Sequence, residues 1–174
     1  MPPPGGLAGG DTLNMRWGVA PGAHGLVTTP GATRFYKTVG EPALQRTAST
    51  FAAHSRMEWH ALETIAFSGC AAENRLILSP ANGAEMICWV ITTLILPTTN
   101  KPFDARVFCQ HFELPGVWLE RARIQASDQL LLDSPTGLAG QRCFATLFFV
   151  WGTSLGKARR QGILDAAPPR DCST

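Results

Sequence analysis

The amino-acid sequence predicts an all-β fold with very little helix, built from stacked short strands in a β-helix-like or sandwich-like scaffold. Three observations predict it: apolar residues alternate with period two, turn signals recur about every 8–12 residues, and helical periodicity is weak throughout. With 174 residues the chain is long enough for one domain with a hydrophobic core. We expect a single β domain over residues 1–155, followed by a loose tail over residues 156–174.

The first expected strand shows the alternation most clearly. In Thr12–Val19 every second residue is apolar, which is typical of a strand with one buried face. A turn is expected at Pro21-Gly22, and Gly, Pro, Asn, Asp and Ser separate the strands that follow. The sequence predicts these strands at 23–29, 33–39, 44–51, 56–60, 64–67, 74–79, 85–96, 105–113, 116–125 and 143–151.

Helices and membrane spans are not favoured anywhere in the chain. The best helical candidate, 58–67, is short and rich in β-favouring aromatic and branched residues. The apolar runs 86–96 and 143–155 are shorter than the roughly 20 residues that span a bilayer, so we predict buried strands there. The tail combines cations, Pro168-Pro169 and small residues without a period, and we expect it to be irregular.

Charge is sparse in this chain. Charged residues make up 16% of it, against roughly 25% in an average soluble domain, which suggests that part of the surface contacts partners. A net charge of +2 is too small to indicate nucleic-acid binding, and we interpret Lys157, Arg159 and Arg160 as solvated surface. Arginine supplies twelve of the 15 cations, a bias that protein interfaces share, although codon usage could also produce it.

The N-terminus and the cysteines favour a cytoplasmic location. Residues 1–6 contain neither the basic region nor the apolar segment of a secretory signal. The five cysteines lie far apart and form no Cys-x-x-Cys pair, so we expect reduced thiols, mostly buried as small hydrophobic side chains. They are Cys70, Cys88, Cys109, Cys143 and Cys172.

Common catalytic and metal-binding motifs are missing from the sequence. It contains no Gly-x-Ser-x-Gly elbow, phosphate-binding loop or His-Glu-x-x-His, and the glycine-rich stretch 5–10 lacks the dinucleotide-binding spacing. Cys109 and His111 would share one strand face, but two ligands make a weak metal site, and a buried Cys beside a surface His is favoured. These absences leave an enzyme unsupported but not excluded; we name no catalytic residue and expect no permanently bound cofactor or metal.

Glu120 is the acid with the least expected surroundings. The pleat places it on the same strand face as Trp118 and Ile124 and turns Arg121 to the other face. A carboxylate among apolar side chains is costly unless it is paired, protonated or faces a wet cavity. Two interpretations stay open: a cross-strand salt bridge to an arginine, or a functional acid.

Several short motifs occur in a recognisable order. The most specific are the Pro3-Pro4-Gly5-Gly6 leader, which precedes Asp11, and the corner segment TTPGATRFYK at 28–37. They are followed by Glu58-Trp59, ETIAFSG at 63–69, Trp89, Pro97, Leu119-Glu120-Arg121 and Gly137-Leu138. In this order they resemble the urease accessory protein UreD family, called UreH in some bacteria, from about residue 2 to about residue 150.

The resemblance implies a non-enzymatic urease maturation factor. Such a scaffold binds apo-urease and UreF, holds the GTPase UreG through UreF, and helps deliver nickel to the urease active site. Nickel would be in transit, and neither nucleic acid nor a membrane is an expected partner. The corner motif Thr29, Pro30, Gly31, Phe35 and Tyr36 would set hydroxyls and aromatic rings against an internal polar passage.

The resemblance also implies an internal channel for nickel, lined by acidic and hydroxyl side chains. Asp11, Thr33 and Glu120 stand at the matching positions and are the channel candidates. The chemistry is suitable, because Ni²⁺ accepts carboxylate and water oxygens, and a transit path needs several weak stations.

The chain departs from the family pattern at several positions. Val90 follows Trp89 where the family carries an acid, Ala61-Leu62 replaces a Pro-Gln pair, and Ser68 replaces an Asp. Family members are also longer, with strands before the leader and a further region after about residue 155. Two alternatives stay open: a truncated or degenerate remnant without nickel-delivery activity, and an unrecognised enzyme that uses Glu58 and Glu120 as acids.

Overall fold

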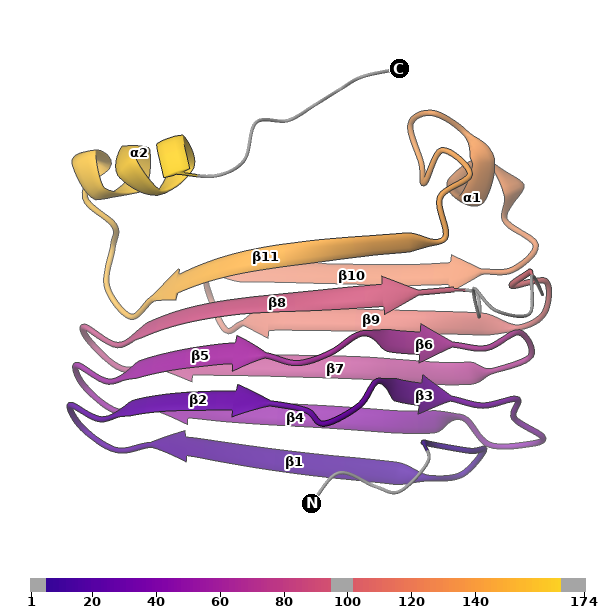
Figure 1. The fold of residues 1–174 in the computed structure, drawn as a ribbon, viewed down its shortest axis with the longest axis horizontal. Coiled ribbons are helices and arrows are strands. Elements are labelled where there is room, and N and C mark those ends of the chain that lie inside the picture. The colour runs from indigo at the N-terminus through magenta and orange to yellow at the C-terminus, as the bar shows by residue number, and fades with distance from the viewer. Residues whose placement is uncertain (1–5, 95–101, 167–174) are drawn as a thin grey trace.

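A computed structural model describes residues 6–94 and 102–166 and shows two β-sheets packed face to face (Figure 1). Sheet I has the strand order β1-β4-β7-β9-β10; sheet II has the order β2-β5-β8-β6-β3, and β11 also pairs with β8. The predicted mainly β fold is confirmed. The strands are β1 (Thr12–Val19), β2 (His24–Thr28), β3 (Thr33–Phe35), β4 (Ala43–Phe51), β5 (Arg56–His60), β6 (Thr64–Ala66), β7 (Ala71–Pro80), β8 (Glu85–Thr93), β9 (Val107–Leu114), β10 (Trp118–Gln125) and β11 (Cys143–Trp151).

The chain passes alternately through the two sheets, so neighbouring strands come from successive passes. In sheet I, β1, β4, β7 and β9 run parallel, and in sheet II the β2-β5-β8 and β3-β6-β8 series are parallel too. The antiparallel pairs come late in the chain, where β10 pairs with β9 and β11 with β8. This coiled course is β-helix-like, the first of the two predicted scaffolds.

The predicted alternation is confirmed in the middle strands of sheet I. In β4 the odd-numbered residues from Ala43 to Phe51 are buried, and in β7 the even-numbered residues from Ala72 to Leu78 are buried. The turns expected between strands lie at the ends of the sheets, as Figure 1 shows. One face of each of these two strands therefore builds the space between the sheets.

The two apolar runs form strands over Glu85–Thr93 and Cys143–Trp151 but are less buried than predicted; residues 95 and 96 of the first run lie outside the described part of the chain. Strands β8 and β11 pair with each other near the edge of sheet II, and their outward side chains remain accessible, with Ile87 37% and Leu147 59% exposed. The reason is that nothing among the described residues packs a third layer on this face. No helix in the described ranges is long and apolar enough to cross a bilayer.

Two helices lie beyond the edge formed by β10 and β11 (Figure 1). Helix α1 (Gln129–Asp133) begins after Asp128, whose side chain accepts a hydrogen bond from the backbone N of Leu131. Helix α2 (Lys157–Ala166) has no buried residue. The tail that we expected to be loose is therefore helical over these residues but packs none of them into the core; residues 167–174 lie outside the described part of the chain. Good helix formers such as Lys, Ala, Arg, Gln and Leu fill α2 without any apolar period.

The core between the sheets consists of two apolar clusters. The first contains Leu7, Phe35, Ala43, Ala66, Cys70, Ala72, Leu94, Phe103, Phe108, Ile124 and Leu132. The second contains Phe51, Met57, Trp59, Leu76, Leu78, Ala84, Met86, Cys88, Phe112, Phe148 and Val150. They occupy opposite ends of the strands, and buried polar side chains lie between them.

The cysteines follow the prediction only in part. Cys70 and Cys88 are buried, one in each apolar cluster, and burial raises the pKa of each thiol to about 12. Cys109 is half-buried and Cys143 is exposed, so the expectation of mostly buried thiols holds for two of these four. Cys172 lies outside the described residues.

Candidate functional site

The Pro30-Gly31 corner interrupts sheet II. Strand β2 ends at Thr28 and β3 begins at Thr33, and in the next pass β5 ends at His60 and β6 begins at Thr64. The parallel pairing of β2 with β5 and of β3 with β6 puts the two breaks beside each other (Figure 1). At this seam backbone groups have lost their ladder partners and need others.

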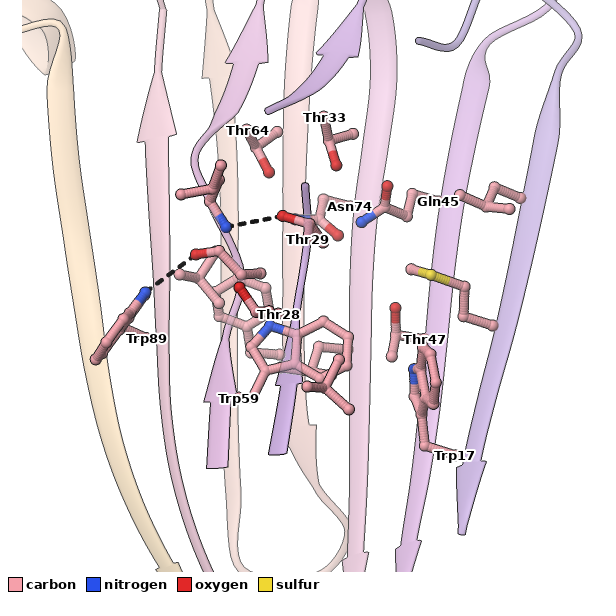
Figure 2. A pocket seen from close by; sticks show the side chains of 18 of the residues that line it. Trp17, Thr28, Thr29, Thr33, Gln45, Thr47, Trp59, Thr64, Asn74 and Trp89 are labelled. Atoms are coloured by element: carbon pink, nitrogen blue, oxygen red, sulfur yellow. Dashed lines mark hydrogen bonds between the residues drawn. The ribbon is translucent and has the colours of Figure 1, made fainter. Parts of the chain in front are cut away.

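Side chains satisfy the backbone at the seam. The hydroxyl of Thr28 donates to the carbonyl O of His60 at 2.9 Å, and the hydroxyl of Thr29 accepts from the backbone N of Leu62 at 3.0 Å. From the third pass, the indole Nε1 of Trp89 donates to the carbonyl O of Ala61 at 3.0 Å (Figure 2). The hydroxyls of the corner motif thus replace ladder hydrogen bonds, which explains why two threonines precede the proline.

Behind the seam lies a cavity of about 250 Å³ between the two sheets. Its walls combine the rings of Trp17, Trp59 and Trp89 with polar side chains (Figure 2). The polar lining residues include Thr29, Thr33, Gln45, Thr47, Thr64 and Asn74, and Pro30 also contributes. An apolar wall with a few converging polar groups is the usual composition of a ligand cavity.

Two rows of polar side chains cross the interior from this cavity. In sheet II the β-register aligns Thr33, Thr64 and Thr92 on neighbouring strands. In sheet I it aligns Gln45, Asn74 and Gln110. Five of the six side chains are buried and Thr33 is half-buried. We call these six residues the polar band.

The polar band ends at Glu120. The hydroxyl of Thr92 donates to Gln110 Oε1 at 3.1 Å and so joins the two sheets, and Gln110 Nε2 donates to Glu120 Oε1 at 3.2 Å. Glu120 is half-buried on the inward face of β10, as the strand alternation predicted. Neither interpretation of this acid included a neutral amide partner. No arginine lies within ion-pair distance of it among the described residues.

Gln45 has an unsatisfied oxygen at the cavity end of the polar band. Its side chain is 7% exposed and lines the cavity, and Oε1 has no hydrogen-bond partner among the described residues. A buried amide oxygen without a partner costs free energy. The cavity therefore presents an acceptor that water or a cation can use.

Asp11 does not join the other two channel candidates. It is exposed just before β1, where its carboxylate accepts a hydrogen bond from the backbone N of Ala8 at 2.8 Å. Thr33 lines the cavity and Glu120 lies at the far end of the polar band. The structure thus connects Thr33 to Glu120 and leaves Asp11 on the surface.

The aromatic part of the corner motif packs away from the cavity. Phe35 is fully buried in the first apolar cluster, with its ring centroid 5.7 Å from that of Phe108. Tyr36 is half exposed and packs on Phe67 at 5.3 Å. A Cβ at Gly6 would lie 2.5 Å from the carbonyl O of Arg34, so the glycine-rich leader is required where it crosses this segment.

Glu58 and Glu120 do not form a pair of acids. Glu58 lies on the outer face of sheet II, where its two carboxylate oxygens lie 2.8 Å from His24 Nε2 and 3.6 Å from His60 Nε2. Glu120 faces the space between the sheets. Among residues 6–94 and 102–166 no group of three or more His, Cys, Asp or Glu is arranged to hold a metal ion.

The sequence analysis missed the amides and two of the threonines of the polar band. Gln45 and Asn74 occupy alternate positions in apolar-patterned strands, where a polar residue at an inward site is the available signal. Their alignment could not be found from one sequence, because register between strands 29 or more residues apart depends on tertiary pairing.

The family model described as UreD urease accessory protein matches residues 1–172. The chain belongs to this family. Curated relatives named urease accessory protein UreD are 62% identical in Polaromonas sp. strain JS666 and 59% identical in Paracidovorax citrulli, each over 165 residues that cover 95% of this chain and 60% of the relative. A relative of that name from Methylibium petroleiphilum is 42% identical over 181 residues, covering 97% of this chain and 61% of the relative.

The family match covers almost the whole of this chain but only part of its relatives. The family match extends to residue 172, so it includes the tail that the sequence analysis left outside the resemblance. The chain spans about 60% of the length of the curated relatives that it matches, which agrees with the expectation that family members are longer.

Proposed function

We propose that this UreD-family chain acts as a non-enzymatic scaffold in urease maturation in the cytoplasm. It binds apo-urease and UreF, holds the GTPase UreG through UreF, and lets nickel ions pass between its two sheets toward apo-urease. One observation supports the nickel path most directly: oxygen-bearing side chains follow one another from the cavity behind the seam, across the polar band, to Glu120.

The polar band offers an oxygen-bearing side chain at each inter-strand step between the cavity and Glu120. From Gln45 to Asn74 to Gln110 to the strand of Glu120 there are three inter-strand steps of 4.7–4.9 Å, or about 14 Å in all. Each step offers an amide or hydroxyl oxygen from one sheet or the other. A hydrated divalent ion exchanging water for such neutral oxygens would be held weakly at every station, as transit requires.

Glu120 would supply the anionic charge at one end of the path. Its hydrogen bond to Gln110 fixes one carboxylate oxygen, and the second oxygen has no hydrogen bond among the described residues. Val90 lines the cavity where the family resemblance expects an acid, so this chain has one carboxylate fewer near the cavity. We infer that nickel transfer through this chain depends more on Glu120 than it would in a family member that has an acid at the position of Val90.

The test uses the chain co-produced with urease subunits, UreF and UreG in a host without urease. Glu120→Gln keeps the shape and the Gln110 contact but removes the charge, and we expect nickel per urease active site to fall several-fold while the complex still co-purifies. Glu41→Gln, at an exposed acid, is the matched control and should leave nickel content unchanged. Metal analysis of purified urease measures both.

Two results would argue against the proposal. Unchanged nickel content in Glu120→Gln would make the carboxylate structural, and failure of the unaltered chain to bind both UreF and apo-urease would favour the degenerate remnant. A gain of nickel in Val90→Asp would support the proposal, because this variant adds the acid expected at the cavity. Its nickel content should exceed that of the unaltered chain.

A further inference from the structure

The outer face of sheet I is rich in arginine. The side chains opposite the buried positions of β1, β4, β7 and β10 include five arginines, whereas two glutamates lie on the same face, on β7 and β9. Both helices lie beyond the β10 and β11 edge and not over this face (Figure 1). We call it the arginine face; it comprises Arg16, Arg46, Arg75, Arg121 and Arg123, with Glu73 and Glu113.

The β-register aligns three of these arginines and His111 in one row. Arg46 pairs with Arg75, Arg75 with His111, and His111 with Arg121 on four consecutive strands. Neighbouring strands are 4.7–4.9 Å apart, so the row is about 14 Å long. Like charges directly opposite each other on one sheet face are destabilising, and Arg46 and Arg75 are such a pair.

The internal compensation for this row is incomplete. Arg75 Nε lies 3.5 Å from Glu73 Oε1, but this nitrogen is buried and forms no hydrogen bond. Arg46 is exposed and has no ion pair among the described residues. The row therefore contains cationic charge that an external anion can neutralise.

His111 positions one end of the row. Arg121 Nε donates to His111 Nδ1 at 3.2 Å, which requires that Nε2 carries the ring proton, and Nε2 lies 2.9 Å from Glu113 Oε2. The ring is 6% exposed because its neighbours cover it. Arg121 is thus held in place before any partner arrives, which reduces the entropy cost of binding.

We propose that the arginine face docks an acidic helix of a partner protein lying across the strands. Acidic residues at i, i+4, i+7 and i+11 form one helix face, with steps of about 4.5–6 Å along the axis at 1.5 Å per residue. Three such steps span about 16.5 Å, close to the length of about 14 Å of the row. Arginine suits the role because its guanidinium binds carboxylates through two parallel hydrogen bonds.

The charge pattern favours a protein partner over nucleic acid. Glu73 and Glu113 flank the row on both sides and would repel a phosphate backbone, while the net charge of the chain is only +2. On a partner helix, lysines beside the acidic row can pair with these glutamates, so that the two acids would set the register of docking. The inference does not depend on nickel transfer.

The test measures binding of the full chain to a helical, alanine-based peptide with glutamates at i, i+4, i+7 and i+11. The control peptide has the same composition with the glutamates distributed around the helix. We expect weaker binding of the control peptide, and about tenfold weaker binding of the patterned peptide when salt rises from about 50 to about 300 mM. Arg46→Glu should reduce binding about tenfold, whereas Arg34→Glu, an exposed arginine on sheet II, should not.

A stability measurement on the same variants separates docking from misfolding. Arg46→Glu places a carboxylate opposite Arg75, so the urea midpoint should stay the same or rise while peptide binding falls. The inference is overturned if Arg46→Glu binds the patterned peptide like the unaltered chain, if both peptides bind equally, or if duplex DNA binds more tightly than the patterned peptide. A lower midpoint in Arg46→Glu would contradict the like-charge repulsion on which it rests.

Discussion

The middle of the interior and its two ends are built from different chemistry. The ends are apolar clusters around Phe108 and Met86, while the polar band crosses the middle with six amides and hydroxyls, five of which are also buried. The apolar clusters gain free energy from every buried methylene, whereas the polar band gains little and must satisfy each polar atom. A scaffold that needed only stability would have apolar side chains at all of these positions.

Stability alone does not explain the polar band, because buried polar side chains contribute less to folding than apolar ones. Gln45 Oε1 is buried without a hydrogen-bond partner among the described residues and lines the cavity, and Ser49 Oγ, on the same face of β4, is also buried without one. Unsatisfied buried polar atoms are uncommon and often mark a site that interacts with something else. The following predictions test whether the two regions differ in this way.

The largest effect is expected in an apolar cluster. Phe108→Ala removes a fully buried ring that packs on Phe35 at 5.7 Å, and should lower the free energy of unfolding by about 3–5 kcal/mol. Urea denaturation followed by tryptophan fluorescence measures it. Val39→Ala, at a side chain that is 86% exposed, should change it by less than about 0.5 kcal/mol. If Phe108→Ala lowers the free energy of unfolding by less than about 1 kcal/mol, the apolar clusters are not more important for stability than the polar band.

A smaller loss is expected inside the polar band. Gln110→Ala leaves the Thr92 hydroxyl and one Glu120 oxygen without their partner, and should lower the free energy of unfolding by about 1–3 kcal/mol. The double variant Thr92→Val, Gln110→Leu removes both members of one bond and should recover part of this loss. If the double variant loses as much free energy of unfolding as the Thr92→Val and Gln110→Leu single variants together, lost packing and not the unpaired polar atoms determines the stability of the interior.

The two buried thiols predict a loss of stability at alkaline pH. Burial raises the pKa of Cys70 and Cys88 from 9.0 to about 12, so the folded chain keeps protons that the unfolded chain releases. The stability that the protonated thiols contribute to the folded chain is fully present below pH 9. As pH rises toward 12, the free energy of unfolding falls by at most about 1.4 kcal/mol per pH unit for each thiol. Cys88→Ala should therefore flatten the fall of the urea midpoint above pH 9. An equal slope in both proteins would contradict the assignment.

The smallest effect on the free energy of unfolding is expected at Gln45, whose side-chain oxygen has no hydrogen-bond partner among the described residues. Gln45→Leu exchanges an unsatisfied oxygen for apolar volume beside the cavity, so the free energy of unfolding should stay within about 1 kcal/mol or increase. Gln45→Glu, which would place a charge at the same buried site, should destabilise the chain. Similar losses in both variants would mean that Gln45 has a partner in solution and that the polar band is a satisfied network.

Local patterning predicted the strands well, because alternation and turn signals depend only on residues that are close together in the sequence. It could also place Glu120 on the inward face of its strand, since the pleat is local. It did not predict α2, because this helix has no apolar period and buries no residue. It also could not align Thr33 with Thr64 and Thr92, because that row exists only once three passes of the chain stack in register.

The channel candidates show the same limit. The family resemblance selected Asp11, Thr33 and Glu120, but a motif position does not say which way a side chain turns. Asp11 caps a turn at the surface through the backbone N of Ala8. Glu120 found a partner, Gln110, that sits one strand away and ten residues earlier. The carboxylate was predictable, and its neutral partner was not.

The seam at the proline corner has a consequence for local motion. The backbone N of Leu62 is held by the Thr29 hydroxyl and the carbonyl O of Ala61 by the Trp89 indole, so neither bond belongs to a strand ladder. Releasing either group breaks one side-chain hydrogen bond and no ladder bond; the Trp89 ring also stacks on His60, with ring centroids 4.2 Å apart. The backbone amide of Leu62 should therefore exchange with deuterium faster than the ladder-bonded amides of β4 and β7, while the rest of the protein stays folded.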